Sequence, residues 1–523
     1  MNIKKIRYIL FLIWILFLFL LAEGVSYFYL RHNPALASRY LEGYERVIAE
    51  NHALLRQPPD ERGFTIFFYG ASTMEGFPFN PVATPATWNE AIFQTLYPNF
   101  KVNAVNFGKG GRKSDYILQA IKQSIKYQPD LLVVLFGHNE FLRSSSIKDE
   151  FGQNLLFNSS FVRLAHAGIQ AARESYQINR FRKEVLKDIK KQSKVEAKKK
   201  IEEKKKYEEK KDKPENFFYP LDFDWVVPGS PGMKAKLSEL KQNLKAMIAV
   251  ARENNVPIVI ATPPFNMKVK PYGNNFVAKD RIALKKWEEH AQKGVSLFHE
   301  KQYDQALEEF KQAEKIDNTN ALLAFYMGES LERLGLFDRA VYYYNRANQY
   351  DLGKTRIIQK SEAIIRNTCR DNGVPYLNIH DIFIREVENG IVGFSLILDN
   401  AHPNLEGQYL LSVSLFRLIV ENTSYIPKLT GVIPSFDQMV TKLSMSKEFE
   451  YIKYRQLGDY YLNHFDKSFS FYEKAYEAMP TKEIILRILA LCKRFGEYEE
   501  AKPYIEKLST IKDRGLDIKV PIS

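Results

Sequence analysis

Five short apolar runs, each followed by a stretch with helical spacing, constrain the fold of this 523-residue chain more than any other feature. Residues 114–127 and 237–254 are examples of the amphipathic stretches between them. Continuous apolar strands that alternate with helices are typical of a parallel sheet covered on both faces. The sequence therefore predicts an α/β domain with five strands, over Phe64–Gly70, Val102–Gly108, Pro129–Gly137, Val256–Thr262 and Val374–His380.

An internal repeat with a period of 34 residues interrupts this pattern between the fourth and fifth runs. Small and aromatic residues recur at fixed offsets, which resembles the tetratricopeptide repeat, a stacked pair of helices. We expect residues 281–352 to form a helical insertion that divides the α/β domain into residues 60–280 and 353–425. The matched pairs are Gly294/Gly328, Tyr303/Phe337, Ala306/Ala340, Phe310/Tyr344, Ala313/Ala347 and Asp317/Asp351.

A looser version of the same spacing occurs near the C-terminus. It predicts tetratricopeptide-like helical repeats over residues 445–515, with a generic helical hairpin as the alternative. Stacked helix pairs form concave surfaces that suit a protein partner, although so few repeats could also be purely structural. The residues that keep the spacing are Phe465, Ser468, Tyr472, Ala475 and Pro480, followed 33 residues later by Tyr498, Ala501, Ile505 and Leu508.

The N-terminus reads as a membrane segment. Tyr8–Leu21 is an unbroken apolar run, and its extension to Leu30, with one charge, reaches the ~20 residues that span a bilayer. Three basic residues precede the run and hold the N-terminus in the cytoplasm. We therefore expect residues 1–33 to form a single-pass anchor in the cytoplasmic membrane, with the remainder outside, in the periplasm or at the cell surface. A cleaved signal peptide is the alternative, although the small residues Ala35 and Ala37 lie well past the run.

Charge is concentrated in one arm. Residues 180–213 carry 16 Lys/Arg and 8 Asp/Glu, which is +8 of the net +13 of the chain. Both signs are interleaved at helical spacing, as in a solvated helix or a partly disordered arm. Attraction to anionic lipid head groups or to an acidic polymer is the functional alternative. The remaining chain carries a net charge of only about +5, which is unremarkable for its length, so no nucleic-acid partner is expected.

Residues that can carry chemistry follow several of the predicted strands. Ser72 comes directly after the first strand, at a turn where its hydroxyl points to the edge at which α/β sheets bind ligands. Gly108 ends the second, with a backbone N–H facing the same edge, and Asn139 follows the third. Much later, Asp399 and His402 stand three residues apart just before a helical run, so that both can turn toward one point.

Together these four blocks resemble the signature blocks of SGNH (GDSL-like) hydrolases, over about residues 64–420. The resemblance implies a flavodoxin-like sheet, with Ser72 as nucleophile, His402 as general base and Asp399 as its orienting partner. It also implies an oxyanion hole made by the N–H groups of Ser72 and Gly108 and by the amide of Asn139. Ala71 and Glu140 stand where the family carries aspartates. The chain looks like a membrane-anchored bacterial branch of the family with inserted tetratricopeptide repeats.

Other candidates are weaker. His138 could line the pocket or pack inside the domain. His380-Asp381 could mimic a general base and its carboxylate partner, but this pair lies outside the four blocks. No metal-ligand cluster, phosphate loop or dinucleotide fingerprint is present, so no metal or cofactor is expected. The only two cysteines, Cys369 and Cys492, exclude a disulfide framework and are expected to be buried thiols, with one long-range disulfide as the alternative.

The expected function is a membrane-anchored extracytoplasmic serine esterase that hydrolyses, or transfers, O-acyl groups. Its substrate would be an acylated small molecule or an envelope or exported polysaccharide. The alternative is a non-catalytic scaffold whose repeats bind a partner protein in the cell envelope. The presence of all triad residues favours the enzyme.

Overall fold

The computed structural model describes residues 21, 43–142, 227–272, 281–429, 431–443 and 447–510. The chain divides into two compact units, Met1–Pro58 with Arg143–Lys200, and Pro59–Leu142 with Ile201–Ser523. In the first unit, the described residues form helices α3 (Gly43–Glu50) and α4 (His52–Leu55). Every element described below belongs to the second unit.

Two features predicted from the sequence lie outside the described residues, namely nearly all of segment 1–33 and the whole charged arm 180–213. Among the helices that the structure does describe, none is both long and apolar enough to cross a membrane. The anchor and the arm therefore stay predictions.

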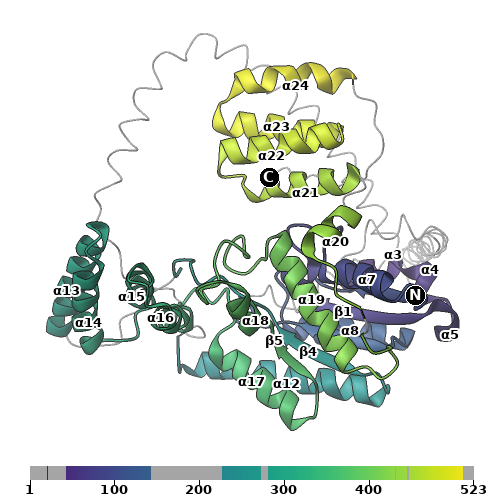
Figure 1. Ribbon diagram of the computed structural model, residues 1–523, viewed down its shortest axis with the longest axis horizontal. Helices are drawn as coiled ribbons and strands as arrows, with labels where there is room; N and C mark the ends of the chain where they lie inside the picture. The colour runs from purple at the N-terminus through teal and green to yellow at the C-terminus, as the bar shows by residue number, and fades with distance from the viewer. Residues whose placement is uncertain are drawn as a thin grey trace, which may run out of the picture. The chain divides into compact units, whose positions relative to one another are not determined.

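The predicted parallel sheet is confirmed. Its strands run in the order β2-β1-β3-β4-β5, and every neighbouring pair is parallel (Figure 1). This is the flavodoxin-like order, in which ligands bind beyond the carboxyl ends of the strands. The strands are β1 (Phe64–Gly70), β2 (Val102–Asn106), β3 (Leu131–Leu135), β4 (Ile258–Thr262) and β5 (Tyr376–Asn378).

Strand register brings the predicted block residues to one edge. Phe68 of β1 pairs with Asn106 at the end of β2, and Gly70 pairs with Leu135 at the end of β3. The carboxyl ends of the three strands are therefore nearly level. Residues that follow them, including Ser72 and Asn139, leave the sheet at the same edge.

Helices cover both faces of the sheet because its strands are apolar on both sides. On one face, Ile66, Phe68 and Val133 share a buried core with residues of α7 (Pro85–Leu96) and α19 (Leu405–Glu421). On the other face, the hydroxyls of Tyr69 and Ser124 share a 2.7 Å hydrogen bond. Three helices pack together there, α8 (Ser114–Ser124), α12 (Pro231–Glu253) and α17 (Gln359–Asp371).

The predicted insertion consists of two consecutive helix pairs. A Cβ added at Gly294 would lie 2.4 Å from the ring of Phe310, and one at Gly328 would lie 3.0 Å from the ring of Tyr344. The same small-to-aromatic contact thus recurs 34 residues apart. The assignment to the tetratricopeptide family stays a prediction. The helices are α13 (Arg281–His299), α14 (Tyr303–Ile316), α15 (Ala321–Arg333) and α16 (Phe337–Tyr350).

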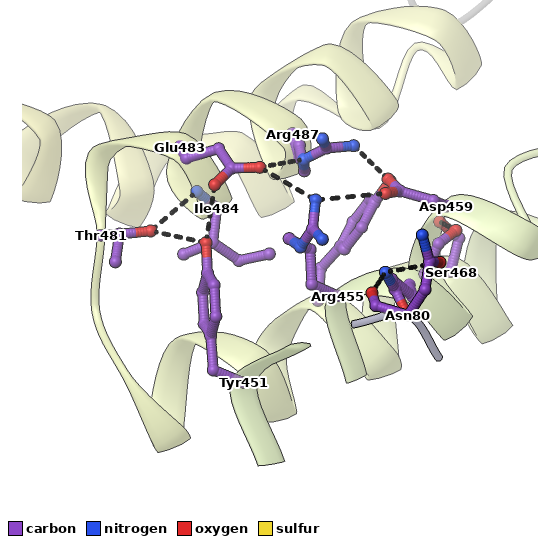
Figure 2. A network of polar contacts seen from close by, with 12 residues as sticks. Asn80, Tyr451, Arg455, Asp459, Ser468, Thr481, Glu483, Ile484 and Arg487 are labelled. Atoms are coloured by element: carbon purple, nitrogen blue, oxygen red, sulfur yellow. Dashed lines mark hydrogen bonds and ion pairs between the residues drawn. The ribbon is translucent and has the colours of Figure 1, made fainter. Parts of the chain in front are cut away.

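Helices also fill the predicted C-terminal repeat region, as α21 (Lys447–Tyr460), α22 (Phe465–Ala478), α23 (Lys482–Phe495) and α24 (Tyr498–Thr510). A polar network joins α21 to α23 (Figure 2). Arg487 pairs with Glu483 at 3.0 Å and with Asp459, and Arg455 pairs with the same two carboxylates. Two cations and two anions balance one another, so these largely buried charges remain compensated.

Both cysteines are buried free thiols, as predicted. The remaining described elements are short. They are α5 (Pro59–Arg62), α6 (Ser72–Glu75), the 3-10 turn η1 (Ile125–Tyr127), α18 (Ile379–Glu386) and α20 (Phe436–Leu443).

Candidate active site

Ser72 lies at the first residue of α6, two residues after β1 ends. Ala71 keeps an extended backbone between them, so the chain turns sharply and the serine leaves the sheet at its carboxyl edge. Gly108 makes this turn possible, because a Cβ on it would lie 2.3 Å from the backbone nitrogen of Glu75. The glycine predicted as a hydrogen-bond donor is thus also required for the close packing of α6.

Three predicted residues form one hydrogen-bonded chain. Nε2 of His402 lies 2.8 Å from Oγ of Ser72, and Nδ1 of the same ring lies 2.6 Å from Oδ2 of Asp399. Ser72 precedes His402 by 330 residues, so the fold alone brings them together. These distances are those expected between a nucleophile, its general base and the group that orients the base.

The protonation states in this chain follow from Asp399. Burial acts to raise the pKa of this carboxyl, but hydrogen bonds from the His402 ring and from the backbone N–H groups of Ala401 and His402 outweigh burial and hold the pKa below its usual value. The carboxylate is therefore an acceptor, and Nδ1 of His402 carries a proton. In the neutral ring Nε2 is then the acceptor, so the Ser72 hydroxyl donates to it.

The turn from Leu398 to His402 holds the acid and the base in register. Oδ1 of Asp399 accepts the backbone N–H groups of Ala401 and His402, each at 2.8 Å. The N–H of Leu398 donates to the carbonyl of His402, also at 2.8 Å, and closes the turn at its base. Outside the turn, the ring of Phe77 meets the His402 ring edge-on with centroids 4.7 Å apart.

Gly108 does not offer the free N–H that was predicted for the oxyanion hole. Its N–H donates to Oδ1 of Asn106 at 2.9 Å, because the Asn106 amide bridges this loop to the carbonyl of Met74. Farther along the same loop, the N–H of Gly110 donates to Oε2 of Glu75 at 2.7 Å. The prediction for Gly108 is therefore wrong in this conformation of the loop.

Two other backbone donors remain at this edge. Within the described residues, the N–H groups of Ser72 and Gly111 have no hydrogen-bond partner. Gly111 has a φ of +71°, which glycine adopts without strain, and it follows Gly110, whose added Cβ would lie 3.8 Å from Cβ of Ser72. The pair Gly110-Gly111, which follows Gly108 in the same loop, was the sequence signal for this donor.

Asn139 and Glu140 both hold the loop that precedes α8. Nδ2 of Asn139 donates to the carbonyl of Arg112 at 3.1 Å, which uses one of its two N–H groups. The carboxyl of Glu140 accepts the backbone N–H of Ser114 at 3.0 Å and its hydroxyl at 2.7 Å. Burial raises the pKa of Glu140 to about 7, against hydrogen bonds from Ser114 that lower it.

His138 packs inside the domain. Its Nδ1 accepts the N–H of Ile357 at 2.9 Å, so Nε2 carries the proton and donates to the carbonyl of Pro264 at 3.0 Å. Burial, and to a smaller extent the nearby His402, lower the pKa of this histidine to about 3. Of the two roles considered for His138, the geometry agrees with packing rather than with lining a pocket.

The other histidine, His380, is also buried and stacks on Phe265 with ring centroids 3.9 Å apart. Burial lowers its pKa to about 3 as well. Its Nδ1 accepts a 3.4 Å hydrogen bond from the backbone N–H of Phe265, whereas Ser72 pairs with His402. Asp381 is exposed. This pair therefore does not compete with Asp399 and His402.

Sequence reasoning missed the residues that support the Asp399–His402 turn. The N–H of Asn266, which follows β4, donates to the carbonyl of Asn400 at 3.1 Å. Arg356 in turn donates to the carbonyl of Asn266 at 3.0 Å and pairs with Asp351 at 3.1 Å. The position of Asn266 after a strand's carboxyl end was its only sequence signal. Asp351 was noticed only as a repeat position.

No group of His, Cys, Asp and Glu residues that could hold a metal ion occurs within the described part of the chain.

Comparison with known proteins gives structural neighbours only. No family model and no curated protein matches the chain. A GDSL-like lipase from Bacteroides thetaiotaomicron is 12% identical, with a TM-score of 0.32 over 73% of this chain and 98% of its own. The acetylxylan esterase Axe2 from Geobacillus stearothermophilus is 11% identical, with a TM-score of 0.29 over 70% of this chain and 97% of its own. Likeness at this level carries no weight for function, which is derived below from the residues of the site.

Proposed function

We propose that this chain is a serine esterase, similar to the SGNH hydrolases, that cleaves O-acyl esters through Ser72, His402 and Asp399. The observation that carries the proposal is the continuous hydrogen-bonded chain of 2.8 Å and 2.6 Å through the two nitrogens of His402. A serine hydroxyl is a weak nucleophile until an adjacent base takes its proton, and this arrangement supplies that base.

In the first half of the reaction, Oγ of Ser72 attacks the ester carbonyl carbon while Nε2 of His402 takes the hydroxyl proton. Asp399 stabilises the imidazolium that forms and keeps Nδ1 protonated. When the tetrahedral intermediate collapses, the C–O bond to the alcohol breaks and His402 gives its proton to the leaving oxygen. An acyl group then remains on Ser72.

In the second half, His402 takes a proton from water, and the hydroxide adds to the acyl carbon. Collapse releases the carboxylic acid and returns the proton to Oγ of Ser72. A sugar hydroxyl in place of water would give acyl transfer by the same steps. Hydrolysis is proposed because it requires no second binding site.

The negative charge on the carbonyl oxygen requires preorganised donors. We assign this role to the backbone N–H groups of Ser72 and Gly111 and to the second N–H of the Asn139 amide. The first two have no partner among the described residues, and the third is free because Arg112 uses only one amide proton. This assignment replaces Gly108, whose N–H donates to Asn106.

We further propose that the enzyme acts outside the cytoplasm, tethered by residues 1–33, on O-acylated or O-acetylated polysaccharide of the envelope or on exported polysaccharide. The apolar run of the N-terminal sequence supports the tether, and the substrate class is the kind of ester that an enzyme tethered there would meet. The helical insertion and the C-terminal helices would offer a surface to a protein partner.

A scaffold without catalytic activity is the rival function. A scaffold does not require a serine at position 72. It also does not explain why the ionised Asp399 forms a hydrogen bond with His402. The test uses the full-length chain in detergent, short-chain aryl esters and a fluorophosphonate probe. Wild-type protein should hydrolyse the esters and bind the probe covalently, and Ser72→Ala should do neither. Equal rates in the two proteins would remove the esterase proposal in favour of the scaffold.

A further inference from the structure

Helix α21 of the C-terminal region contacts the turn that carries Asp399 and His402 and the loop that follows α6, the helix that begins with Ser72. The hydroxyl of Tyr460 donates to the carbonyl of Leu398 at 2.8 Å. Four residues earlier, Nε2 of Gln456 donates to the carbonyl of Asn80, in the loop that follows α6. Residues four apart lie on the same side of a helix. One side of α21 therefore contacts both the turn that carries the acid and the base and the loop that follows the helix of Ser72.

Leu398 is the residue at the base of the Asp399–His402 turn. Its N–H donates inward to the carbonyl of His402, and its carbonyl accepts the Tyr460 hydroxyl from outside. Both backbone polar groups of this residue are thus used, one by the turn and one by α21. Because Leu398 directly precedes Asp399, a shift of its peptide plane is transmitted to the carboxylate that orients His402.

The contact of α21 with the α/β domain is also apolar. Phe449, only 2% exposed, belongs to the same buried core as Trp88 of α7 and Tyr409 of α19, and Leu457 packs against that core. Burial raises the pKa of Tyr460, and the charge of Asp399 raises it further, so its hydroxyl keeps its proton and remains a donor at neutral pH. Packing around the Tyr460 side chain therefore holds its hydrogen bond to Leu398, and the hydroxyl can donate that bond at neutral pH.

We propose that Tyr460 is a positioning residue for the reaction, and that the C-terminal helical region completes the active site through it. The inference rests on the proposed esterase function and extends it to a residue outside the four family blocks. Tyr460 does not touch the reacting atoms. It acts through the Leu398 carbonyl on the orientation of Asp399 and His402. A ligand that displaces α21 would consequently lower turnover without entering the site.

The test compares Tyr460→Phe with Tyr461→Phe in the full-length protein. The two residues are adjacent in the sequence, and each substitution removes one hydroxyl while keeping the aromatic ring. Tyr461 stacks on Phe471 at 5.7 Å, and within the described residues its hydroxyl makes no hydrogen bond, so its variant is a matched control. The measurements are kcat and KM on an aryl ester, and amide hydrogen exchange of the peptide 396–404.

Loss of one neutral hydrogen bond corresponds to about a tenfold change at most. Tyr460→Phe should therefore lower kcat by about fivefold to tenfold, leave KM within about twofold and speed exchange in 396–404. Tyr461→Phe should match the wild type in all three. A merely structural role would lower the melting temperature of Tyr460→Phe without changing kcat, and that outcome overturns the proposal.

Failure of the proposed function is distinguished from failure of this inference. If the wild type and Ser72→Ala are equally inactive on esters, the esterase proposal fails, and the exchange measurement alone decides about Tyr460. Faster exchange of 396–404 in Tyr460→Phe only would then support its positioning role in the turn. Equal exchange of this peptide in the wild type, Tyr460→Phe and Tyr461→Phe would overturn the positioning role.

Discussion

Oδ2 of Asp399 lies 2.6 Å from Nδ1 of His402, while Oδ1 of the same carboxylate accepts two backbone N–H groups of the turn that carries the histidine. One side chain therefore fixes both the shape of the turn and the tautomer of the base. These two duties are chemically separable, because an amide can keep the first and not the second.

Asp399→Asn separates them. Its amide oxygen can still accept the two backbone N–H groups, but an NH₂ group facing His402 favours the tautomer with the proton on Nε2. Ser72 then faces a donor and cannot be deprotonated. We expect kcat to fall by about 10³–10⁴ with little change in melting temperature. A variant with wild-type kcat would show that Asp399 has only a structural role, and a large loss of stability would show that the amide does not preserve the turn.

Glu140 gives the protein a pH-dependent stability. Its pKa is raised by burial from 4.5 to about 7, so the folded state favours the neutral acid. The corresponding stabilisation is complete below pH 4.5 and is lost as the pH rises through 7. A shift of this size corresponds to about 3 kcal/mol.

The measurement is urea denaturation of the wild type and of Glu140→Gln at pH 4.5 and at pH 8. The decrease in unfolding free energy between the two pH values should be about 3 kcal/mol smaller in the variant. The exposed Glu388→Gln is the control and should keep the wild-type decrease. Identical decreases in all three proteins would show that Glu140 is already ionised in the fold.

The sheet could be predicted from the sequence because its signals are local. Each strand is an apolar run, and the residues that flank it in the sequence mark its ends. The bounds predicted for β1 are the observed ones. The hydrogen-bonded chain of Ser72, His402 and Asp399 could be predicted because its members lie at a strand end or just before a helix. The later strands are shorter than predicted, with β5 reduced to Tyr376–Asn378, since periodicity does not mark where pairing stops.

The supports of the site could not be predicted in the same way. Tyr460 contacts a carbonyl 62 residues away, and Arg356 contacts one 90 residues away. Neither contact leaves a local pattern, because a backbone carbonyl accepts from any donor that the fold brings near. Gly108 was misassigned for a related reason. Its spacing suited an N–H donor, but the direction of that N–H depends on the Asn106 side chain.

Asp351 and Arg356 connect the helical insertion to the Asp399–His402 turn, and both side chains are 2% exposed. Removing only the negative partner leaves a buried cation, so Asp351→Asn should cost about 3 kcal/mol or more. Arg356→Met added to it removes that cation. We expect the losses of unfolding free energy in the single variants Asp351→Asn and Arg356→Met, added together, to exceed the loss in the double variant by about 2 kcal/mol.

Urea denaturation of the four proteins measures this coupling. The exposed pair Arg370–Asp371, with side chains 72% and 60% exposed, provides the control cycle and should couple by less than about 1 kcal/mol. Additive losses in the buried cycle would mean that the pair does not act as a unit.

Asn139 has one contact in the structure and one proposed role in catalysis, and its substitution separates them. Its amide holds the carbonyl of Arg112 at 3.1 Å and is also assigned to the oxyanion hole. If it stabilises charge that exists mainly in the transition state, Asn139→Ala should lower kcat by about 10²–10³ and leave KM nearly unchanged. If it only holds the loop, the melting temperature should fall while kcat stays equal to that of the wild type.

Asn243→Ala is the matched control for this substitution. Asn243 donates to the hydroxyl of Ser114 at 3.0 Å, at the start of the helix that follows the same loop. It therefore supports the loop without a role assigned at the reacting atoms, and its variant should lose stability with kcat close to wild type. A loss of kcat in Asn243→Ala as large as in Asn139→Ala would assign both effects to the position of the loop. In that case Asn139 would leave the oxyanion hole, and the N–H groups of Ser72 and Gly111 would be its remaining donors.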